Sequence, residues 1–313
     1  MPDNSITVIA AIAADAAAAT VKFVAAAITG SAGMLSQAVQ SAVDTANSGL
    51  LLLGIRLSRK PPDREHPMGH GRELYFWTMV VAMVILGVGG GINVFEGVNR
   101  ILHPRPTQHV LWNYAVLAGA AILDGGSLLI AIRQYRANYL RESFFATFRK
   151  SKDPSIFAVL LEDASDLLGV AAAFLGILLG QRLGMPRLDG AASIVIGAIL
   201  GTVAFLLGRE CHGLLIGEGA SRALLDQIRG AARLDDRIAH VGEPLTMYFG
   251  PDDLMLALSV EFRKDLDADA LAKTIDEMES AIRRAAPGVT RIFIEAQSVI
   301  EAARKPHLAD ELT

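Results

Sequence analysis

The sequence predicts an α-helical membrane protein in which a six-transmembrane-helix bundle precedes a small α+β cytoplasmic domain. One reason is composition: 52% of the 313 residues are hydrophobic and 20% are charged, and a mean hydropathy of +0.38 is too high for a soluble chain of this size. A second is that six apolar segments reach the ~20 residues needed to cross the ~30 Å hydrocarbon core of a bilayer. A third is that charged residues become frequent after Gly208, where spanning-length runs end. We therefore expect a transmembrane domain over residues 1–209, a cytoplasmic domain over 210–300 and a polar tail over 301–313.

The expected spans are separated by polar or glycine-containing segments. Gly30 and Gly33 interrupt the apolar run between the first two spans, which predicts a tight helical hairpin. The start of the chain has neither a basic leader nor a small-residue cleavage site, so we interpret it as a span and not as a cleaved signal. The spans are Ile6–Ile28, Met34–Leu57, Leu74–Val98, Val110–Ile132, Ser155–Leu179 and Leu188–Leu207.

Basic residues predict the orientation, because cytoplasmic loops are enriched in lysine and arginine. The loops after the second and fourth spans, with their flanks, hold eleven such residues, and the opposite side holds four. Both termini and the soluble domain are therefore expected in the cytoplasm, and the expected membrane is a bacterial inner membrane. The eleven are Arg56, Arg59, Lys60, Arg64, Arg72, Arg133, Arg136, Arg141, Arg149, Lys150 and Lys152, and the four are Arg100, Arg105, Arg182 and Arg187.

The soluble part is predicted to run helix, strand, strand, helix, strand. Amphipathic patterns favour helices over residues 221–233 and 269–286, and β-type runs cover 245–249, 254–262 and 289–294. The composition of residues 250–253, Gly-Pro-Asp-Asp, is typical of a hairpin turn. A three-stranded sheet with both helices on one face leaves its other face open, so we expect a homodimer formed through this domain.

The net charge argues against nucleic-acid binding, and the cysteine count excludes cysteine-based structural motifs. The formal net charge of −4 argues against a nucleic-acid partner, which would need a basic patch. Cys211 is the single cysteine, so an intrachain disulfide and multi-cysteine zinc motifs are excluded, and we expect a reduced, inert thiol at the end of the last span.

Acidic residues inside the fifth span are the main functional signal. Glu162 and Asp166 are four residues apart and so share a helix face, whereas Asp163 points roughly 100° away. An acid in a spanning helix faces the bundle interior or a water-filled cavity, which indicates an ion or proton site. The alternative is an internal salt bridge, for which Lys22 is the basic residue deep in a span; Lys22 equally suits Asp15.

The second span also carries polar residues at a four-residue spacing. Gln40 and Asp44 are four apart, and Asn47 lies one turn further along. Two helices that each offer such an oxygen pair can supply four ligands to a hard or borderline divalent cation. These polar groups alternatively act as hydrogen-bonding contacts between helices. For the isolated Asp124 of the fourth span, relay, structural and supporting roles all stay open.

The total charge of the acidic residues suggests how such a site exchanges ions. Asp44, Glu162, Asp163 and Asp166 would total −4 if ionised, and a divalent cation neutralises only half of that charge. Desolvation and neighbouring like charges favour neutral carboxyl groups, so an empty site should hold protons and metal binding should release them. We therefore expect Asp44, Glu162 and Asp166 to couple metal to protons, as a cation/proton exchanger requires.

A loop between the second and third spans is the second candidate. Residues 61–73 contain His66 and His70 with Asp63 nearby, on a short segment that begins with two prolines. Two imidazoles and a carboxylate can bind a transition metal. A turn with solvated or capping histidines is the alternative.

The loop pattern Pro62-Asp63-x-x-His66-Pro67-x-Gly69-His70-Gly71-Arg72 resembles the cation diffusion facilitator family, as do the paired residues of spans two and five. The amino-acid sequences of residues 29–54 and 150–165 are most similar to those of the zinc-transporter-9-like branch of this family. The resemblance implies a homodimer that exports a divalent metal in exchange for protons by alternating access, with six spans and a ferredoxin-like cytoplasmic domain. It implies a transport site at Gln40, Asp44, Glu162 and Asp166, and a weaker loop site at Asp63, His66 and His70.

Departures from the family pattern bear on the substrate. Zinc-selective members usually have a histidine among the four transport ligands and this chain has none, so Mn²⁺, Fe²⁺ and Co²⁺ stand beside Zn²⁺ as candidates. Asp163 is a candidate replacement ligand. The cytoplasmic positions that hold histidine ligands in the family match Gly242, Ser259 and Glu295 here, so we expect little metal binding in that domain. Arg72 and Glu218 match a charged pair that links the family's dimer.

Two other functions are compatible with parts of the sequence. A non-transporting dimeric scaffold or metal sensor would keep the fold, but it would not need the intact acid cluster. An intramembrane aspartyl protease would use acids from two spans, but it requires a Gly-x-Gly-Asp context that no span contains. We therefore expect no enzyme activity, and we expect membrane lipid, protons and a second copy of the chain as partners.

Overall fold

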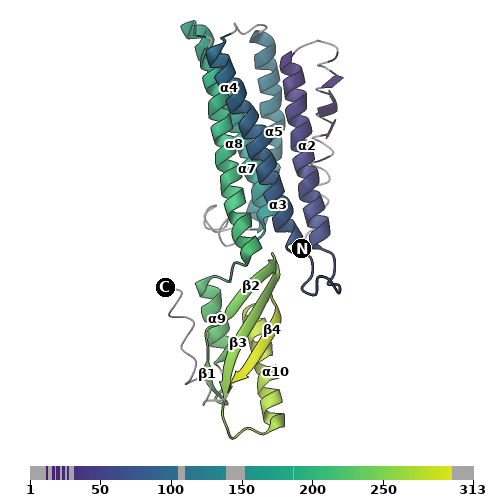
Figure 1. Ribbon diagram of the computed structural model, residues 1–313, viewed down its shortest axis with the longest axis vertical. Coiled ribbons are helices and arrows are strands. Elements are labelled where there is room, and N and C mark those ends of the chain that lie inside the picture. The colour runs from purple at the N-terminus through teal and green to yellow at the C-terminus, as the bar shows by residue number, and fades with distance from the viewer. Residues whose placement is uncertain are drawn as a thin grey trace. The chain divides into compact units, whose positions relative to one another are not determined.

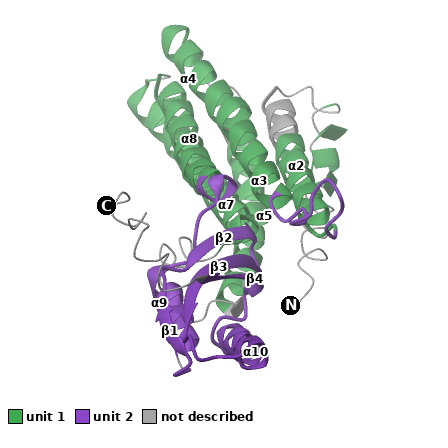
Figure 2. Cartoon of the chain, turned by 60° about the horizontal axis from the view of Figure 1, so that its bottom comes forward, with its two compact units in different colours: residues 1–60, 73–212 green, residues 61–72, 213–313 purple. Residues whose placement is uncertain are grey.

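The computed structural model describes residues 32–104, 110–138, 152–185, 187–233 and 235–297, together with scattered helical positions between 12 and 27. Two compact units are present (Figure 2). One unit comprises residues 1–60 and 73–212, and the other comprises Pro61–Arg72 and Gly213–Thr313. The loop Pro61–Arg72 thus groups with the C-terminal residues and not with the helices that flank it.

The first unit is a bundle of long helices (Figure 1). In its described part α2 packs against α3, and α5 packs against α7. The third helical rod is continuous through α3, η1 and α4. The bounds are α2 Ala32–Ser58, α3 Glu73–Val84, η1 Ile85–Gly91, α4 Ile92–Leu102, α5 Val110–Asn138, α7 Pro154–Leu183 and α8 Arg187–Ile216.

Four described helical stretches are long and apolar enough to cross a membrane: Glu73–Leu102, Tyr114–Arg133, Pro154–Leu183 and Arg187–Ile216. The second predicted span corresponds to α2, which has the necessary length but carries polar residues in its middle. The first predicted span, with Asp15 and Lys22, lies mostly outside the described residues. The predicted fold class, a helical membrane bundle followed by a small α+β domain, is confirmed.

The third rod contains a π-helical segment, η1, whose sequence is Ile-Leu-Gly-Val-Gly-Gly-Gly. Such segments interrupt the regular α-helical hydrogen bonding and are frequent at functional sites. The rod also lies close to α8: a Cβ on Gly97 would come within 2.7 Å of the Gly190 carbonyl oxygen. The two backbones can approach this closely because neither glycine carries a side chain.

The C-terminal unit contains α9 Arg222–Ala232, β1 Ile238–Val241, β2 Leu245–Gly250, β3 Asp253–Phe262, α10 Ala268–Ala285 and β4 Val289–Gln297. β2 and β3 form an antiparallel hairpin, and β4 lies parallel to β3 after the α10 crossover. β1 pairs antiparallel with the far end of β3, so β1 and β2 follow one another along the same side of β3. Ser221 and Asp267 cap α9 and α10 by accepting hydrogen bonds from backbone N–H groups.

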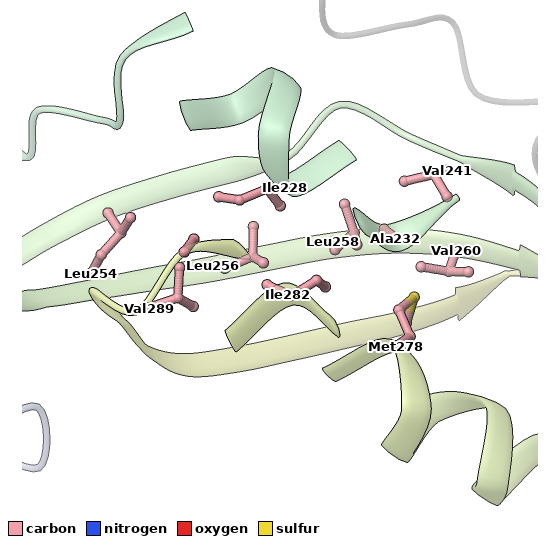
Figure 3. Close-up of a cluster of buried hydrophobic side chains, with 11 residues drawn as sticks. Ile228, Ala232, Val241, Leu254, Leu256, Leu258, Val260, Met278, Ile282 and Val289 are labelled. Carbon is pink, nitrogen blue, oxygen red and sulfur yellow. The ribbon is translucent and has the colours of Figure 1, made fainter. Parts of the chain in front are cut away.

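One face of this sheet holds the core of the unit (Figure 3). Alternate residues of β3, from Leu254 to Val260, are buried against α9 and α10, because successive side chains of a strand point to opposite faces. The other face carries Leu245, Ala257 and Phe293 in one row across the strands. Leu245 is 69% exposed and Phe293 is 51% exposed, so large apolar side chains are open on that face of the described chain.

Three details differ from the sequence predictions. The last membrane helix continues to Ile216, beyond Leu207, because helical geometry does not end where the apolar run ends. Gly33 lies inside α2, since membrane helices tolerate glycine, and Gly30 is outside the described residues. The four-residue strand β1 was not expected, because so short a run gives little periodic signal.

Candidate functional site

A small cavity inside the first unit is lined by acids from two helices. Asp44 comes from α2, and Glu162 and Asp166 come from α7. The cavity has room for about one water-sized sphere, which also suits a bare metal ion. Its remaining lining residues are Val43, Asn47, Ile85, Gly89 and Leu200.

Each acid reaches the cavity because of its place on its helix. Glu162 and Asp166 are one turn apart on α7, so both carboxyl groups lie on the same face. Gly89 allows η1 to pack closely against α8, because a Cβ at this position would lie 3.1 Å from the Leu200 side chain. The π-helical segment therefore forms part of the cavity wall, a feature that its glycine-rich sequence did not lead us to predict.

Asn47 is the polar residue of the cavity lining that the predicted ligand set omitted. Its amide nitrogen donates a 2.9 Å hydrogen bond to Oε1 of Glu162, which connects α2 with α7. The side chain is only 2% exposed, and its Oδ1 atom is buried without a hydrogen-bond partner. The signal available in the sequence was its position three residues after Asp44, on nearly the same helix face.

Asp163 is placed differently from its neighbours on α7. Its Oδ2 accepts a 2.8 Å hydrogen bond from Ser127 of α5, and Asp163 is not among the residues that line the cavity. This agrees in direction with the ~100° step between consecutive residues of a helix. Gln40 lies on α2, but its side chain is outside the described part of the chain. Asp124 lies half-buried on α5, and its role stays open.

The cavity can hold a cation. Among its described lining residues three are acidic and none is basic. Placing several carboxylates around a small, poorly hydrated space is costly unless they are protonated or bind a positive ion. The donor atoms are oxygens, which suit hard or borderline divalent ions. Occupancy by protons or by one M²⁺ ion therefore fits these residues.

The loop candidates Asp63, His66 and His70 also lie together. One ligand atom of each lies within 4.8 Å of the others, the geometry of a potential metal site. A carboxylate oxygen of Asp63 is 3.5 Å from Nδ1 of His66, and the other is 3.5 Å from Nε2 of His70. Asp63 and His66 are exposed, and His70 is half-buried with its Nδ1 atom lacking a hydrogen-bond partner.

Local turns build this site. Oδ1 of Asp63 accepts hydrogen bonds from the N–H groups of His66 at 2.6 Å and Glu65 at 2.9 Å. The His66 bond is the main reason why the pKa of Asp63 lies below its usual value of 3.8, so the carboxylate stays ionised and able to bind metal in mildly acidic solution. Gly69 has φ = +81°, a conformation that favours glycine, and it turns the chain between the two histidines.

The loop is held against the C-terminal sheet within the second unit. Arg72 donates to the Met247 sulfur, and its guanidinium lies 4.5 Å from the centroid of the Phe249 ring. Arg291 donates to the Met68 carbonyl oxygen at 3.3 Å and is itself paired with Asp253 at 2.7 Å. A Cβ on Gly71 would lie 2.2 Å from the Phe249 carbonyl oxygen, so only glycine fits at this point.

The remaining predicted positions are also in the second unit. Glu218 accepts a backbone hydrogen bond from Tyr248, and the pairing of Glu218 with Arg72 across a dimer stays a prediction. Ser259 donates a 2.8 Å hydrogen bond to Glu295, and Gly242 lies beside Ser259. Among the described residues, Asp63, His66 and His70 form the group of three potential ligands whose atoms all lie within 4.8 Å of one another, and the three acids of the cavity are spaced more widely than that.

Comparisons with known proteins identify the family to which the helical unit belongs. The family described as "Cation efflux transmembrane domain" matches residues 8–216. The human protein named proton-coupled zinc antiporter SLC30A9, mitochondrial, is 39% identical over 197 residues, covering 62% of this chain and 35% of the human protein. Its Xenopus laevis counterpart is 31% identical over 306 residues, covering 85% of this chain and 55% of the frog protein. Metal tolerance protein C4 of Arabidopsis thaliana is 26% identical over 310 residues, covering 85% and 67%.

The chain thus spans from about a third to about half of the length of its SLC30A9 relatives. The family match covers the helical unit that contains the cavity, so this part of the chain is a cation efflux transmembrane domain of an integral membrane protein. The chain therefore belongs to the cation efflux, or cation diffusion facilitator, family and stands close to the zinc-transporter-9-like branch.

Proposed function

We propose that this protein exports a divalent metal ion from the cytoplasm in exchange for protons. The observation that carries the proposal is the single cavity shared by Asp44 of α2 and by Glu162 and Asp166 of α7. Three acids around one small space favour a positively charged occupant. The names of the relatives, which include proton-coupled zinc antiporters, support the same function.

Proton exchange follows from the charge of the empty cavity. Carboxyl groups that are close together and poorly hydrated take up protons when no cation is present. A metal ion binds to the deprotonated groups and releases those protons. If the cavity faces each side of the membrane in turn, metal moves one way and protons move the other, which is alternating access.

The donor set favours oxygen-preferring ions among the candidates. The lining residues offer carboxylate and amide oxygens but no imidazole, so Mn²⁺, Fe²⁺ and Co²⁺ fit at least as well as Zn²⁺. Gln40 and Asp163 stay as further predicted ligands. The loop residues Asp63, His66 and His70 are proposed as a second site, with nitrogen donors and weaker, exchangeable metal binding.

A homodimer formed through the C-terminal unit is part of the proposal. The row of Leu245, Ala257 and Phe293 leaves apolar area on the sheet face opposite the two helices. A second copy of the chain that covers this face would remove it from water. A Phe293→Cys variant in a Cys211→Ala background should form an oxidised dimer, and a chain that stays monomeric under oxidation contradicts this interface.

The proposed orientation places the loop and the C-terminal unit in the cytoplasm of a bacterial cell. Because Cys211 is the single cysteine and is buried, a cysteine-free background is easy to build. Cysteines introduced at the exposed positions Arg64 and Lys264 should react with an impermeant reagent only from the cytoplasmic side. A cysteine at the exposed His103 should react only from the opposite side, and the reverse labelling pattern would overturn the orientation.

Transport is tested with purified protein in liposomes that contain a pH dye and a metal dye. An imposed metal gradient should drive metal movement together with opposite proton movement, and Asp44→Ala should abolish both while the oligomeric state is kept. Metal movement without proton movement contradicts exchange. A wild-type protein that binds metal but moves none would instead support the scaffold or sensor function.

A further inference from the structure

Asn47 has two polar groups in a buried position, and the structure explains one of them. Its amide nitrogen faces Glu162, where a carboxylate oxygen needs a donor. This leaves its carbonyl oxygen, Oδ1, on the other side of the planar amide. That atom is buried and has no hydrogen-bond partner, and Asn47 is one of the residues that line the cavity.

A purely structural role for Asn47 accounts for the nitrogen but not for the oxygen. A hydrogen bond between α2 and α7 would hold the two helices together, as polar side chains do in membrane proteins. It would not require an unpartnered oxygen beside three acidic side chains, because an unsatisfied buried acceptor destabilises the fold. A cation in the cavity supplies the missing partner.

We propose that Asn47 is a ligand of the transported cation and that it also positions Glu162. The proposed coordinating residues are then Asp44 and Asn47 from α2 and Glu162 and Asp166 from α7, all of which line the cavity. This inference rests on the proposed transport function and adds to it a neutral ligand. A neutral amide oxygen adds no charge to the site, and it favours ions that accept oxygen ligands over those that prefer nitrogen.

Two substitutions separate the ligand role from the structural role. Asn47→Leu removes both polar groups at similar size. Asn47→His keeps a hydrogen-bond donor and replaces the oxygen by an imidazole nitrogen, which suits Zn²⁺. Thr45→Val is the matched control, because Thr45 is on the same helix, bonds to the Ser41 backbone oxygen and is not a lining residue of the cavity.

The experiment measures metal binding and transport in parallel. All variants carry His66→Ala and His70→Ala so that the loop site does not contribute to binding of Mn²⁺ or Zn²⁺ in titration calorimetry. We expect Asn47→Leu to weaken Mn²⁺ binding by about 10- to 100-fold. We expect Asn47→His to shift the preference for Zn²⁺ over Mn²⁺ by about 10-fold or more, in both the binding constants and the KM for transport. Thr45→Val should change neither quantity.

The outcomes distinguish this proposal from the transport function itself. If Asp44→Ala abolishes binding but Asn47→Leu binds both metals like the background protein, Asn47 is a structural residue and the proposal is wrong. If wild-type protein binds metal through Asn47 but does not transport it, the ligand role stands and the transport function fails. If Asn47→Leu does not fold, the metal preference of Asn47→His decides, and an unchanged preference overturns the ligand role.

Discussion

The two candidate metal sites of this protein differ in burial and in the atoms that they offer to a metal ion. The cavity site lies between helices and is lined by oxygen-bearing side chains at positions 44, 47, 162 and 166 and by apolar residues. The loop site is largely exposed, sits on eight residues of continuous sequence and offers two imidazoles beside one carboxylate. Burial makes negative charge in the cavity costly without a cation or protons, whereas water screens the loop. Under the proposed function, the cavity is the site of cation and proton exchange and the loop is a site of additional metal binding.

The same substitution in each site should therefore have very different effects. Asp166→Asn removes a carboxylate from the cavity, and we expect transport to fall by roughly 100-fold or more, because the proposed site loses a cation ligand and a group that binds a proton. Asp63→Asn removes an exposed carboxylate and should change transport by less than about 10-fold, as expected for surface charges. Initial rates in liposomes measure both. Equal losses at the two sites would contradict the distinction between them.

Substitution of the loop histidines should weaken metal binding more than it slows metal transport. A double substitution of His66→Ala and His70→Ala should remove one of two binding events in calorimetry and weaken transport by only about two- to tenfold. The size and oligomeric state of the variant in detergent serve as controls. If this variant loses transport as completely as Asp166→Asn, the loop belongs to the transport path itself.

The attachment of the loop to the C-terminal sheet can be weakened without touching a metal ligand. Gly71→Ala would place a Cβ against the Phe249 carbonyl oxygen, and we expect a cost of about 1–3 kcal/mol in the docking of residues 61–72. Gly230→Ala in α9 is the matched control, since a Cβ there meets nothing and should stabilise the helix by about 0.5–1 kcal/mol.

Hydrogen exchange in detergent measures this effect. The amide groups of residues 61–72 should exchange roughly 5- to 150-fold faster in Gly71→Ala and at an unchanged rate in Gly230→Ala. Unchanged exchange in both variants would show that the loop is not held by this contact.

The smallest expected effect concerns the ion pair between Asp235 and Arg237, just before β1. Hydrogen bonds donated by Arg237 hold the pKa of Asp235 below 3.8, so Asp235 stabilises the folded unit above the pKa that it has in the unfolded chain. That stabilisation is lost as the pH falls through the lower folded value. Wild-type protein should be more stable than Asp235→Asn at about pH 6, and the difference should shrink progressively as the pH falls below about 4. Acid titrations followed by circular dichroism check this, and a difference that grows in acid contradicts it.

Much of the helical unit could be predicted from the sequence, because its signals are local. Apolar run length located the spans, and the four-residue spacing of Glu162 and Asp166 placed both on one face. The same helical geometry predicted that Asp163 points elsewhere, and the structure places it against Ser127. What spacing could not tell was whether Asn47 is a contact between helices or part of the cavity, since that depends on which atoms face a distant helix.

The loop shows the other limit of prediction from sequence. Its ligand pattern is local and could be recognised, but its position depends on residues far along the chain. Arg291 contacts Met68, and Phe249 contacts Gly71 and Arg72, and these pairs are separated by more than 170 residues. Sequence periodicity gives no information on such pairings. The sequence therefore predicted a candidate metal site in the loop but not that the loop groups with the C-terminal residues.

Proton release on metal binding tests the central claim most directly. Protein with His66→Ala and His70→Ala, in weakly buffered detergent solution, is mixed with Mn²⁺ while bound metal and pH are followed together. We predict the release of about one or more protons per bound ion. We also predict that metal binding and proton release are lost together in Asp44→Asn and in Asp166→Asn. Metal binding without proton release, or release that survives both substitutions, would contradict a cavity that holds protons and metal in turn.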